Sequence, residues 1–328
     1  MFMLLGCLSL YAADNDLITK QITIKLEKAG TLPDRIGSSK KYKITNLKII
    51  GEINGTDLKM IREMVGSNST DGKLSVLDLS EAKIIEGGNN GYYTSNDVIG
   101  NYAFEGCSGL TSLTLPTGIT SIGYGAFIGC SGLTSLTLPA GITKIGSSAF
   151  SGCSGLTSLT LPAGITEIDD KAFDGCSGLT SLTLPAGITS IGYGAFHGCR
   201  GLTSLTLPDG ITSIGDKAFS SCSGLTSIYV YAEKVPKIGG NVFEGIDAKK
   251  CTLYVPMGTY DDYWLSEFGD YFENIVEFEA TGIDKTTTST DVEEVARYSV
   301  NGQRLSAPTK GLNIVKYSDG SVKKVAVR

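Results

Sequence analysis

The sequence predicts a solenoid of stacked 23-residue repeats with a cap at each end, and three observations predict it. The ten letters CSGLTSLTLP occur at 107–116, 130–139, 153–162 and 176–185, and at 199–208 with Arg200 in place of serine. Cysteines recur with the same period, at 107, 130, 153, 176, 199 and 222. Repeat units beginning with isoleucine start at 99, 122, 145, 168, 191 and 214, with a degenerate seventh at 238. A fixed period of about 20–50 residues is typical of repeat architectures.

Each unit contains the pattern L-x-x-L-x-L, first at Leu110, Leu113 and Leu115, which at this period is typical of a leucine-rich-repeat solenoid. We expect a parallel β-sheet on the concave face and short strands or 3-10 turns elsewhere. One unit cannot fold alone. Its six large apolar side chains contribute about 1.5–3 kcal/mol each, whereas ordering each residue costs about 1.5 kcal/mol. Stacking on neighbouring units must supply the difference.

Within one unit, Leu136 and Leu138 alternate with polar residues, which indicates a strand with one buried face. Pro139 ends this strand because proline has no N–H for the ladder. A second short strand is expected at 142–145. The Ala149-Phe150 pair, followed by Gly and Cys, predicts a helical or 3-10 turn that returns the chain to the sheet.

The N-terminal cap is expected over 14–98 and the repeats over 99–250. Residues 42–51 indicate a strand, and 54–66 indicate an amphipathic helix with Thr56 as its N-cap. Residues 73–84 form a degenerate first rung, in which three leucines occupy the L-x-x-L-x-L positions: Leu74, Leu77 and Leu79.

The C-terminal cap is expected over 251–279, where the period breaks and the only tryptophan, Trp264, occurs. We interpret this segment as a strand, a short helix and a closing strand. The Thr-rich segment 280–291 is a predicted linker. Residues 292–328 predict a small β domain, because apolar residues alternate there and Asn301-Gly302 and Asp319-Gly320 are typical of hairpin turns.

Residues 1–13 indicate a signal peptide, since residues 2–11 are apolar and are followed by small residues and then an acid. Cleavage is expected at Ala12 or Ala13, although the usual basic segment is absent. Alternatively, Leu4 to Cys7 is a lipoprotein cleavage box and Cys7 is lipidated. No other apolar run approaches the roughly 18 residues of a membrane-spanning helix, so none is expected in the mature chain.

Charge excludes one class of partner. Charged residues are 19% of the chain, the formal net charge is −6, and no run of Lys or Arg exceeds two. Nucleic-acid-binding proteins carry basic patches or stripes, so no nucleic-acid partner is expected.

No catalytic, metal or cofactor site is expected either. His197 is the only histidine, and its equivalents in other units vary freely, which indicates a solvent-facing position. A Ser/His/Asp triad or a typical zinc site would need it. The cysteine ladder is interpreted as free core thiols rather than disulfides or a metal strip. The pairs Asp169-Asp170 and Asp261-Asp262 are interpreted as solvated surface, not calcium ligands, and the aromatic residues over 254–278 as cap packing, not a sugar platform.

The candidate binding surface is the exposed face of the predicted sheet, where each rung presents two hydroxyl side chains. Only ten of the 122 residues from 107 to 228 are charged. The candidate residues are Ser112, Thr114, Ser135, Thr137, Ser158, Thr160, Ser181, Thr183, Ser204, Thr206, Ser227 and Tyr229. A ligand there would be bound through hydrogen bonds to the hydroxyls and through shape complementarity rather than through charge.

The unit IGNYAFEGCSGLTSLTLPTGITS (99–121) resembles the BspA-like, Treponema-type leucine-rich repeats of bacterial surface proteins. The flanks INGTDLKMIREM (53–64) and CTLYVPMGTYDDY (251–263) resemble the caps of that family, so the resemblance covers about 42–279. It implies an exported, curved, non-enzymatic solenoid that serves as an adhesin or interaction protein.

The tail GLNIVKYSDGSVKKVAVR (311–328) resembles the terminal β domain of type IX secretion cargo, with Asn313 where that pattern commonly has tyrosine. Two interpretations stay open for it: a sorting or anchoring domain, or a small β module of another purpose.

Together these features predict an exported binding protein, located at the cell surface or secreted, which contacts a host extracellular protein, a glycan or another bacterial cell. The alternative is a structural spacer or envelope assembly component without a soluble ligand. A carbohydrate hydrolase is disfavoured, because its two carboxylates would have to come from the caps.

Overall fold

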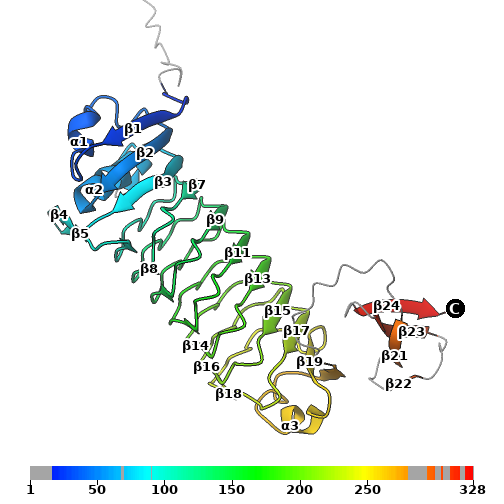
Figure 1. Ribbon diagram of the computed structural model, residues 1–328. Coiled ribbons are helices and arrows are strands. Elements are labelled where there is room, and N and C mark those ends of the chain that lie inside the picture. Colours follow the sequence, from blue (N-terminus) through cyan, green and yellow to red (C-terminus); the bar gives the residue numbers. More distant parts are fainter. Residues whose placement is uncertain are drawn as a thin grey trace, which may run out of the picture.

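The computed structural model describes residues 17–67, 70–89, 91–279, 294–299, 304–305, 311–317 and 322–327. The predicted signal peptide, Cys7 and the linker 280–291 lie outside this range. The described chain winds into an elongated β-solenoid with a cap at each end, followed by a small β region (Figure 1). The predicted leucine-rich-repeat solenoid is therefore confirmed.

The long sheet runs along one side of the solenoid (Figure 1). Its repeat strands are β7 (Ser112–Thr114), β9 (Ser135–Thr137), β11 (Ser158–Thr160), β13 (Ser181–Thr183), β15 (Ser204–Leu207) and β17 (Ser227–Val230). Neighbouring strands pair in parallel and in register, so that Leu113 lies opposite Leu136. Hydrogen-bonded pairing is interrupted once, between β13 and β15, which still lie side by side. The second residue of each strand, a leucine or in β17 Ile228, is buried and its two neighbours face outward.

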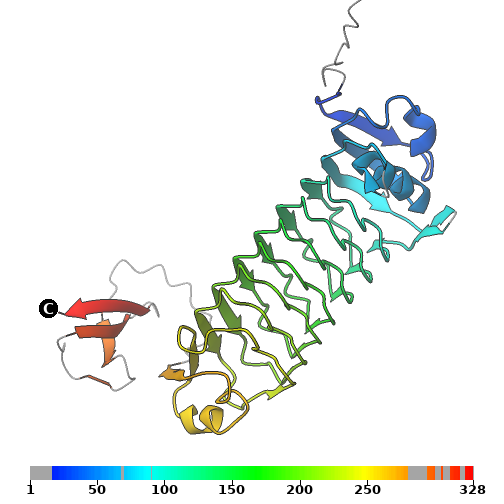
Figure 2. The same cartoon turned by 180° about the vertical axis from the view of Figure 1, so that it is seen from behind.

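Two-residue strands form a second ladder along the other side of the solenoid (Figure 2). One sheet contains β6 (Val98–Ile99), β8 (Ser121–Ile122) and β10 (Lys144–Ile145). The next contains β12 (Glu167–Ile168), β14 (Ser190–Ile191), β16 (Ser213–Ile214) and β18 (Lys237–Ile238). The second strand expected at 142–145 is thus present over its last two residues.

The turn around Ala149-Phe150 is a series of single turns rather than a 3-10 helix. Hydrogen bonds of the i to i+3 type join Ser151 N–H to the Ser148 carbonyl and Cys153 N–H to the Phe150 carbonyl, each at 3.1 Å. Helical continuation stops because Ser148 and Gly152 have φ of +55° and +73°. The Phe150 N–H instead donates to the Ala172 carbonyl of the next unit at 2.8 Å. These segments therefore form a third hydrogen-bonded ladder between units.

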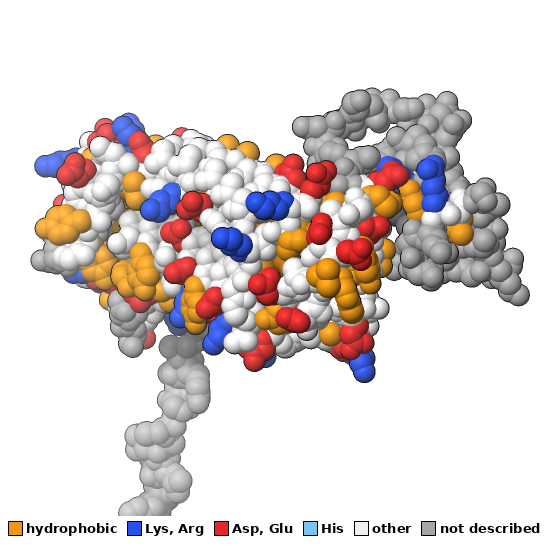
Figure 3. All heavy atoms as spheres, turned by 90° about the horizontal axis from the view of Figure 1, so that it is seen from below, with side chains coloured by type: hydrophobic (Ala, Val, Ile, Leu, Met, Phe, Trp, Pro, Cys, Tyr) orange, Lys and Arg blue, Asp and Glu red, His pale blue; other side chains and the backbone are white. Residues whose placement is uncertain are grey.

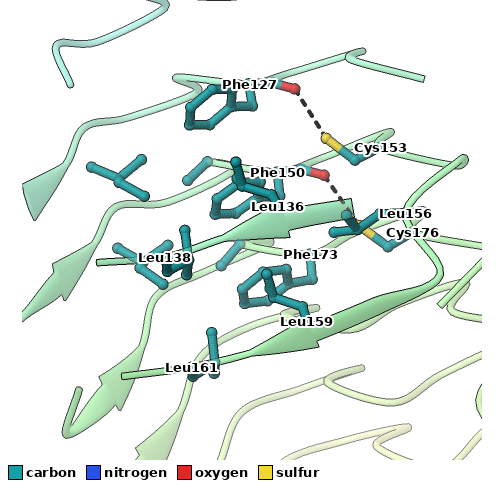
Figure 4. Packing of buried hydrophobic residues seen from close by; sticks show 14 of the residues in the cluster. Phe127, Leu136, Leu138, Phe150, Cys153, Leu156, Leu159, Leu161, Phe173 and Cys176 are labelled. Atoms are coloured by element: carbon teal, nitrogen blue, oxygen red, sulfur yellow. Dashed lines mark hydrogen bonds between the residues drawn. The ribbon is translucent and has the colours of Figure 1, made fainter. Parts of the chain in front are cut away.

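The core is a set of parallel columns, one for each apolar position of the repeat (Figure 4). Phenylalanine rings from Phe104 to Phe243 stack face to face, with centroids 5.1–5.9 Å apart and planes within 8° of parallel. Leucines from the strands and a column of cysteines pack beside them. Each unit therefore completes its core only against its neighbours.

The N-terminal cap extends the long sheet by three strands. Its elements are β1 (Ile22–Leu26), α1 (Leu32–Arg35), β2 (Asn46–Ile53), α2 (Gly55–Val65), β3 (Val76–Ile84), β4 (Gly87–Asn89) and β5 (Tyr92–Thr94). The strand predicted at 42–51 appears as β2, and the leucines of the degenerate first rung are buried around β3. The edge strand β1 was not predicted, because only three of its five residues are apolar and it lies before the recognisable pattern.

The predicted helix 54–66 is present as α2, but its predicted N-cap was wrong. Asn54, not Thr56, is the N-cap, and its Oδ1 accepts from Thr56 N–H at 3.0 Å. Asp57 closes a capping box by accepting from Asn54 N–H at 2.9 Å. Asparagine is the stronger N-cap residue, and only Asn54 has a carboxylate three positions later to complete the box.

The C-terminal cap contains the expected strand, short helix and closing strand: β19 (Thr252–Pro256), α3 (Tyr260–Trp264) and β20 (Asn274–Phe278). Although the sequence period breaks here, β19 and β20 continue the parallel ladder from β17. The buried rings of Phe268 and Phe272 pack against Phe243 and close the phenylalanine column. Trp264 remains exposed.

A small antiparallel sheet follows the solenoid, in the order β22 (Arg304–Leu305), β21 (Glu294–Ser299), β23 (Gly311–Tyr317), β24 (Val322–Val327). Glu279, just after β20, accepts from the Tyr298 hydroxyl at 2.9 Å and pairs with Lys316 Nζ at 2.5 Å. Over the described residues, no helix has the length and apolar character needed to cross a membrane.

Candidate binding surface

The predicted candidate residues occupy two columns on the long sheet, which we call the hydroxyl ladder. Residues two apart on a strand face the same side, and the parallel register places Ser112 beside Ser135 and Thr114 beside Thr137. The ladder consists of Ser112, Thr114, Ser135, Thr137, Ser158, Thr160, Ser181, Thr183, Ser204, Thr206, Ser227 and Tyr229. The first nine of these are exposed and the last three are half-buried.

The hydroxyls of the ladder differ from those of the adjacent threonine column. Thr157 and Thr180 each donate from Oγ1 to the equivalent threonine carbonyl of the preceding unit, at 3.3 and 3.1 Å. These flanking hydroxyls stabilise the stack. No hydrogen bond joins a serine or threonine hydroxyl of the ladder to any other part of the described chain. Their donors and acceptors are therefore available to solvent or to a ligand.

The middle of the ladder is slightly hollowed. A depression of about 340 Å³ lies over β9 and β11, lined by Ser135, Thr137, Ser158 and Thr160, with Pro162 at its rim. This volume is near the lower end of ligand pockets, which span about 300–1,000 Å³.

The threonine column ends at an aromatic wall. Thr206 pairs with Tyr229, which pairs with Tyr254 in the C-terminal cap. The two tyrosine rings stack at 4.4 Å, and Phe278 meets Tyr229 edge-on at 5.9 Å. Burial, and then the neighbouring Tyr254, raise the pKa of Tyr229. Sequence analysis missed Tyr254 and Phe278 at this surface because they follow the break in the period, although the alternation in TLYVP could have indicated a further rung.

The other chemically suggestive residues serve the solenoid itself. His197 is exposed, with its Nδ1 2.9 Å from Asp174 Oδ1, and Asp170 accepts from the Tyr193 N–H at 2.8 Å. No cluster of three or more His, Cys, Asp or Glu that could hold a metal occurs in the described part of the chain. On the face shown in Figure 3, acidic and basic side chains lie side by side in the left half, whereas acidic side chains predominate in the right half.

The described cysteines, from Cys107 to Cys251, are free and buried, as predicted. The Cys153 and Cys176 thiols donate to the carbonyls of Phe127 and Phe150, each at 3.2 Å (Figure 4). Burial raises the pKa of Cys176 to about 12, so this thiol stays protonated near neutral pH. The cysteine column therefore packs the core and offers no nucleophile.

Comparison with known proteins identifies similar chains. Residues 93–200 and 143–268 match the model of the BspA type leucine rich repeat region, in six copies. A leucine rich repeat protein of Treponema pallidum is 30% identical, with a TM-score of 0.44 over 52% of this chain and 75% of that one. A leucine-rich repeat protein of Bacteroides ovatus is 22% identical, with a TM-score of 0.46 over 80% and 70%. A leucine rich cell surface protein of Faecalibacterium prausnitzii is 20% identical, with a TM-score of 0.31 over 74% and 89%. No curated protein matches significantly.

Proposed function

The chain belongs to the BspA-type leucine-rich repeat family, and on that premise we propose that it is an exported, surface-exposed binding protein whose ligand docks on the hydroxyl ladder. The observation that carries the proposal is a row of eleven exposed or half-exposed serine and threonine hydroxyls with no intramolecular partner in the described chain. The apolar segment at residues 2–11 supports export.

The geometry of the ladder favours an extended ligand. Rungs of a parallel sheet lie about 4.8 Å apart, and each new hydrogen bond contributes about 0.5–1.5 kcal/mol net. A ligand that contacts one rung gains little, whereas one that spans several rungs adds these contributions. A host extracellular protein, a glycan or the surface of another cell meets this requirement. Because the ladder carries no charge, binding should change little with ionic strength.

The test is binding of the purified full chain to an array of matrix proteins and glycans. A variant with Ser158, Thr160, Ser181 and Thr183 changed to Lys places four charges on the ladder without touching the core. We expect this variant to lose the ligand by at least about tenfold, because each lysine removes a hydroxyl and covers its neighbours. A matched control changes Ser108, Ser131, Ser154 and Ser177, four exposed serines outside the ladder, to Lys and should keep binding.

A structural spacer or envelope assembly component is the second candidate function. Its support is the uninterrupted phenylalanine column, which gives a stiff rod from Phe104 to Phe243. Under this function neither the parent nor the variants would bind any member of the array, and the chain would self-associate at high concentration. For residues 292–328 we propose a sorting or anchoring role, to be tested by following secretion after deletion of this segment.

A further inference from the structure

A second hollow lies at the N-terminal end of the solenoid and shares no residue with the hydroxyl ladder. It is formed by α2, β5 and the first turn of the repeats, and its volume is about 400 Å³. The residues that matter for its chemistry are Arg62, Tyr92, Tyr93, Tyr102 and Glu105. We call it the N-terminal pocket. Figure 1 places its elements α2 and β5 on the side away from β7 and β9.

Arg62 supplies a buried positive charge at this pocket. The residue is only 3% exposed. Its Nη1 donates to the Tyr102 carbonyl, and its guanidinium carbon lies 5.6 Å from the centre of the Tyr92 ring. Its Nη2 is 3.9 Å from Glu105 Oε2, which is beyond hydrogen-bond distance, and its Nε has no hydrogen-bond partner in the described chain. Buried charged groups are normally paired or fully hydrogen-bonded, so this guanidinium is incompletely satisfied.

The buried carboxylate on the same helix does not compensate Arg62. Asp57 accepts from three backbone N–H groups, those of Gly30, Leu32 and Asn54, at 2.6, 2.9 and 2.9 Å. These hydrogen bonds fix the start of α1 and cap α2, so the Asp57 carboxylate is not a partner for Arg62. The edge of the guanidinium formed by Nε and Nη2 thus remains without a bonded acceptor. Nε is shielded from solvent, so Nη2 is the nitrogen of this edge that can donate to a carboxylate oxygen of a ligand.

The walls of the pocket offer flat aromatic surface beside this charge. Tyr93 is 71% exposed and Tyr102 is 42% exposed. The Tyr102 ring is held edge-on against Tyr124, with centroids 5.1 Å apart. Lys59, which does not line the pocket itself, lies 5.9 Å from the centre of the Tyr92 ring. Aromatic rings next to a cationic donor fit a ligand with an apolar ring face and a negative group.

We propose that the N-terminal pocket binds a saccharide that carries a carboxylate, such as a sialic or uronic acid residue. The ligand carboxylate accepts from Arg62 Nη2, which lies 3.9 Å from Glu105 Oε2, and the sugar ring packs against Tyr93 and Tyr102. The Glu105 carboxylate lies beside the same edge of Arg62, and in the free protein it is the nearest anion. A bound acid would displace it, so Glu105 opposes binding.

Isothermal titration of the full chain tests this proposal, with 3′-sialyllactose and glucuronic acid as probes and lactose and glucose as their neutral counterparts. We expect only the acids to bind, and to bind more weakly as salt increases. Arg62→Lys should weaken binding about tenfold or more, because lysine keeps the charge but cannot hold a donor at the position of the planar guanidinium. Glu105→Gln should strengthen binding several-fold, since it removes the competing charge.

Tyr93, which is exposed, and Glu105, which is half-buried, keep the test decisive if Arg62→Lys lowers stability. Tyr93→Ala and Glu105→Gln alter side chains at the surface of the pocket, and circular dichroism can verify that both variants are folded. Equal binding of acids and neutral sugars, or unchanged affinity in both variants, would overturn the proposal. Tighter binding of a peptide through its free carboxylate would overturn the assignment to saccharides. The four-lysine variant of the hydroxyl ladder should retain acid binding, so failure of one site is distinguishable from failure of the other.

Discussion

At the scale of single residues, the cysteine column shows how a reactive side chain becomes inert packing. Each of five thiols, from Cys130 to Cys222, donates to a phenylalanine carbonyl 26 residues earlier, at 3.1–3.2 Å. Burial raises the pKa of Cys107 and of Cys222 to about 12. The thiol is kept protonated because a buried thiolate would lack hydration and would face a carbonyl oxygen.

We predict that stability falls as pH rises above about 9. Because folding raises the pKa of each thiol, the unfolded chain loses its thiol protons at a lower pH than the folded chain does. The stabilisation that each protonated thiol contributes is therefore complete below the thiol pKa of the unfolded chain. It is lost as the pH rises toward the thiol pKa of the folded chain. Each such thiol lowers the free energy of unfolding by about 1.4 kcal/mol per pH unit in that window. Urea unfolding at pH 7.5, 9 and 10.5 measures this slope.

Cys176→Ala serves as the control, because removing one thiol should make the slope shallower even though the variant is less stable at neutral pH. An unfolding free energy that is constant up to pH 10.5 would contradict the prediction. Rapid labelling of the native thiols by a maleimide at pH 7.5 would contradict the burial on which it depends.

At the scale of the element, each rung depends on close approach of its backbone to the rung before it. A Cβ added at Gly178 would lie 2.3 Å from the carbonyl oxygen of Ser154, and the same approach recurs at Gly132, Gly155 and Gly224. The glycine of C-S-G-L is therefore required by the stacking distance. The strands themselves are only two to four residues long in the repeats, so this stacking, not strand length, stabilises them.

We predict that Gly178→Ala lowers the free energy of unfolding by at least about 1–3 kcal/mol, since the rung must shift to relieve the contact between the new Cβ and the Ser154 carbonyl oxygen. Gly187→Ala in the same unit is the matched control. Its Cβ would have no neighbour nearer than 3.8 Å, and its φ lies outside the left-handed region, so its effect should be small. Chemical denaturation of both variants gives the comparison, and similar costs would show that rung spacing does not require glycine.

At the scale of the whole molecule, one ladder passes from β1 through the repeats to β20, apart from the interruption between β13 and β15. Stability of such an array is approximately a sum over units and their interfaces. The caps are part of this array, because β3 and β19 pair directly with repeat strands.

We predict that deletion of residues 146–168, one whole period, leaves a folded and cooperative solenoid. The deletion joins Ile145 to Asp169 in the original phase, so each remaining unit still meets an equivalent neighbour. The denaturant m-value should fall with the surface removed. Deletion of 157–168 is the control, since twelve residues break the phase and should abolish cooperative unfolding. Loss of structure in the 23-residue deletion would contradict the modular account.

The repeat carried enough information to predict most of the solenoid and both columns of the hydroxyl ladder. Leu136 and Leu138 were placed in the core by alternation alone, and Ser135 and Thr137, which alternate with them, were placed outside. The N-cap at Asn54 and the strand β1 were missed, because capping and edge pairing depend on contacts that a single non-repeated segment does not reveal. Tyr254 was missed at the ladder for the same reason.

The sequence by itself determined the period, the buried face of each strand and the polarity of the exposed face, because all three are local and each was repeated six times. Only the tertiary structure decided where residues far apart in the chain meet. It placed Tyr229 against Tyr254, and it buried Arg62 of the cap beside Tyr102 of the first repeat without a full set of partners. The physical reason is that periodicity specifies which side of a rung a residue faces, whereas the surroundings of a cap residue depend on how that cap packs against the first rung.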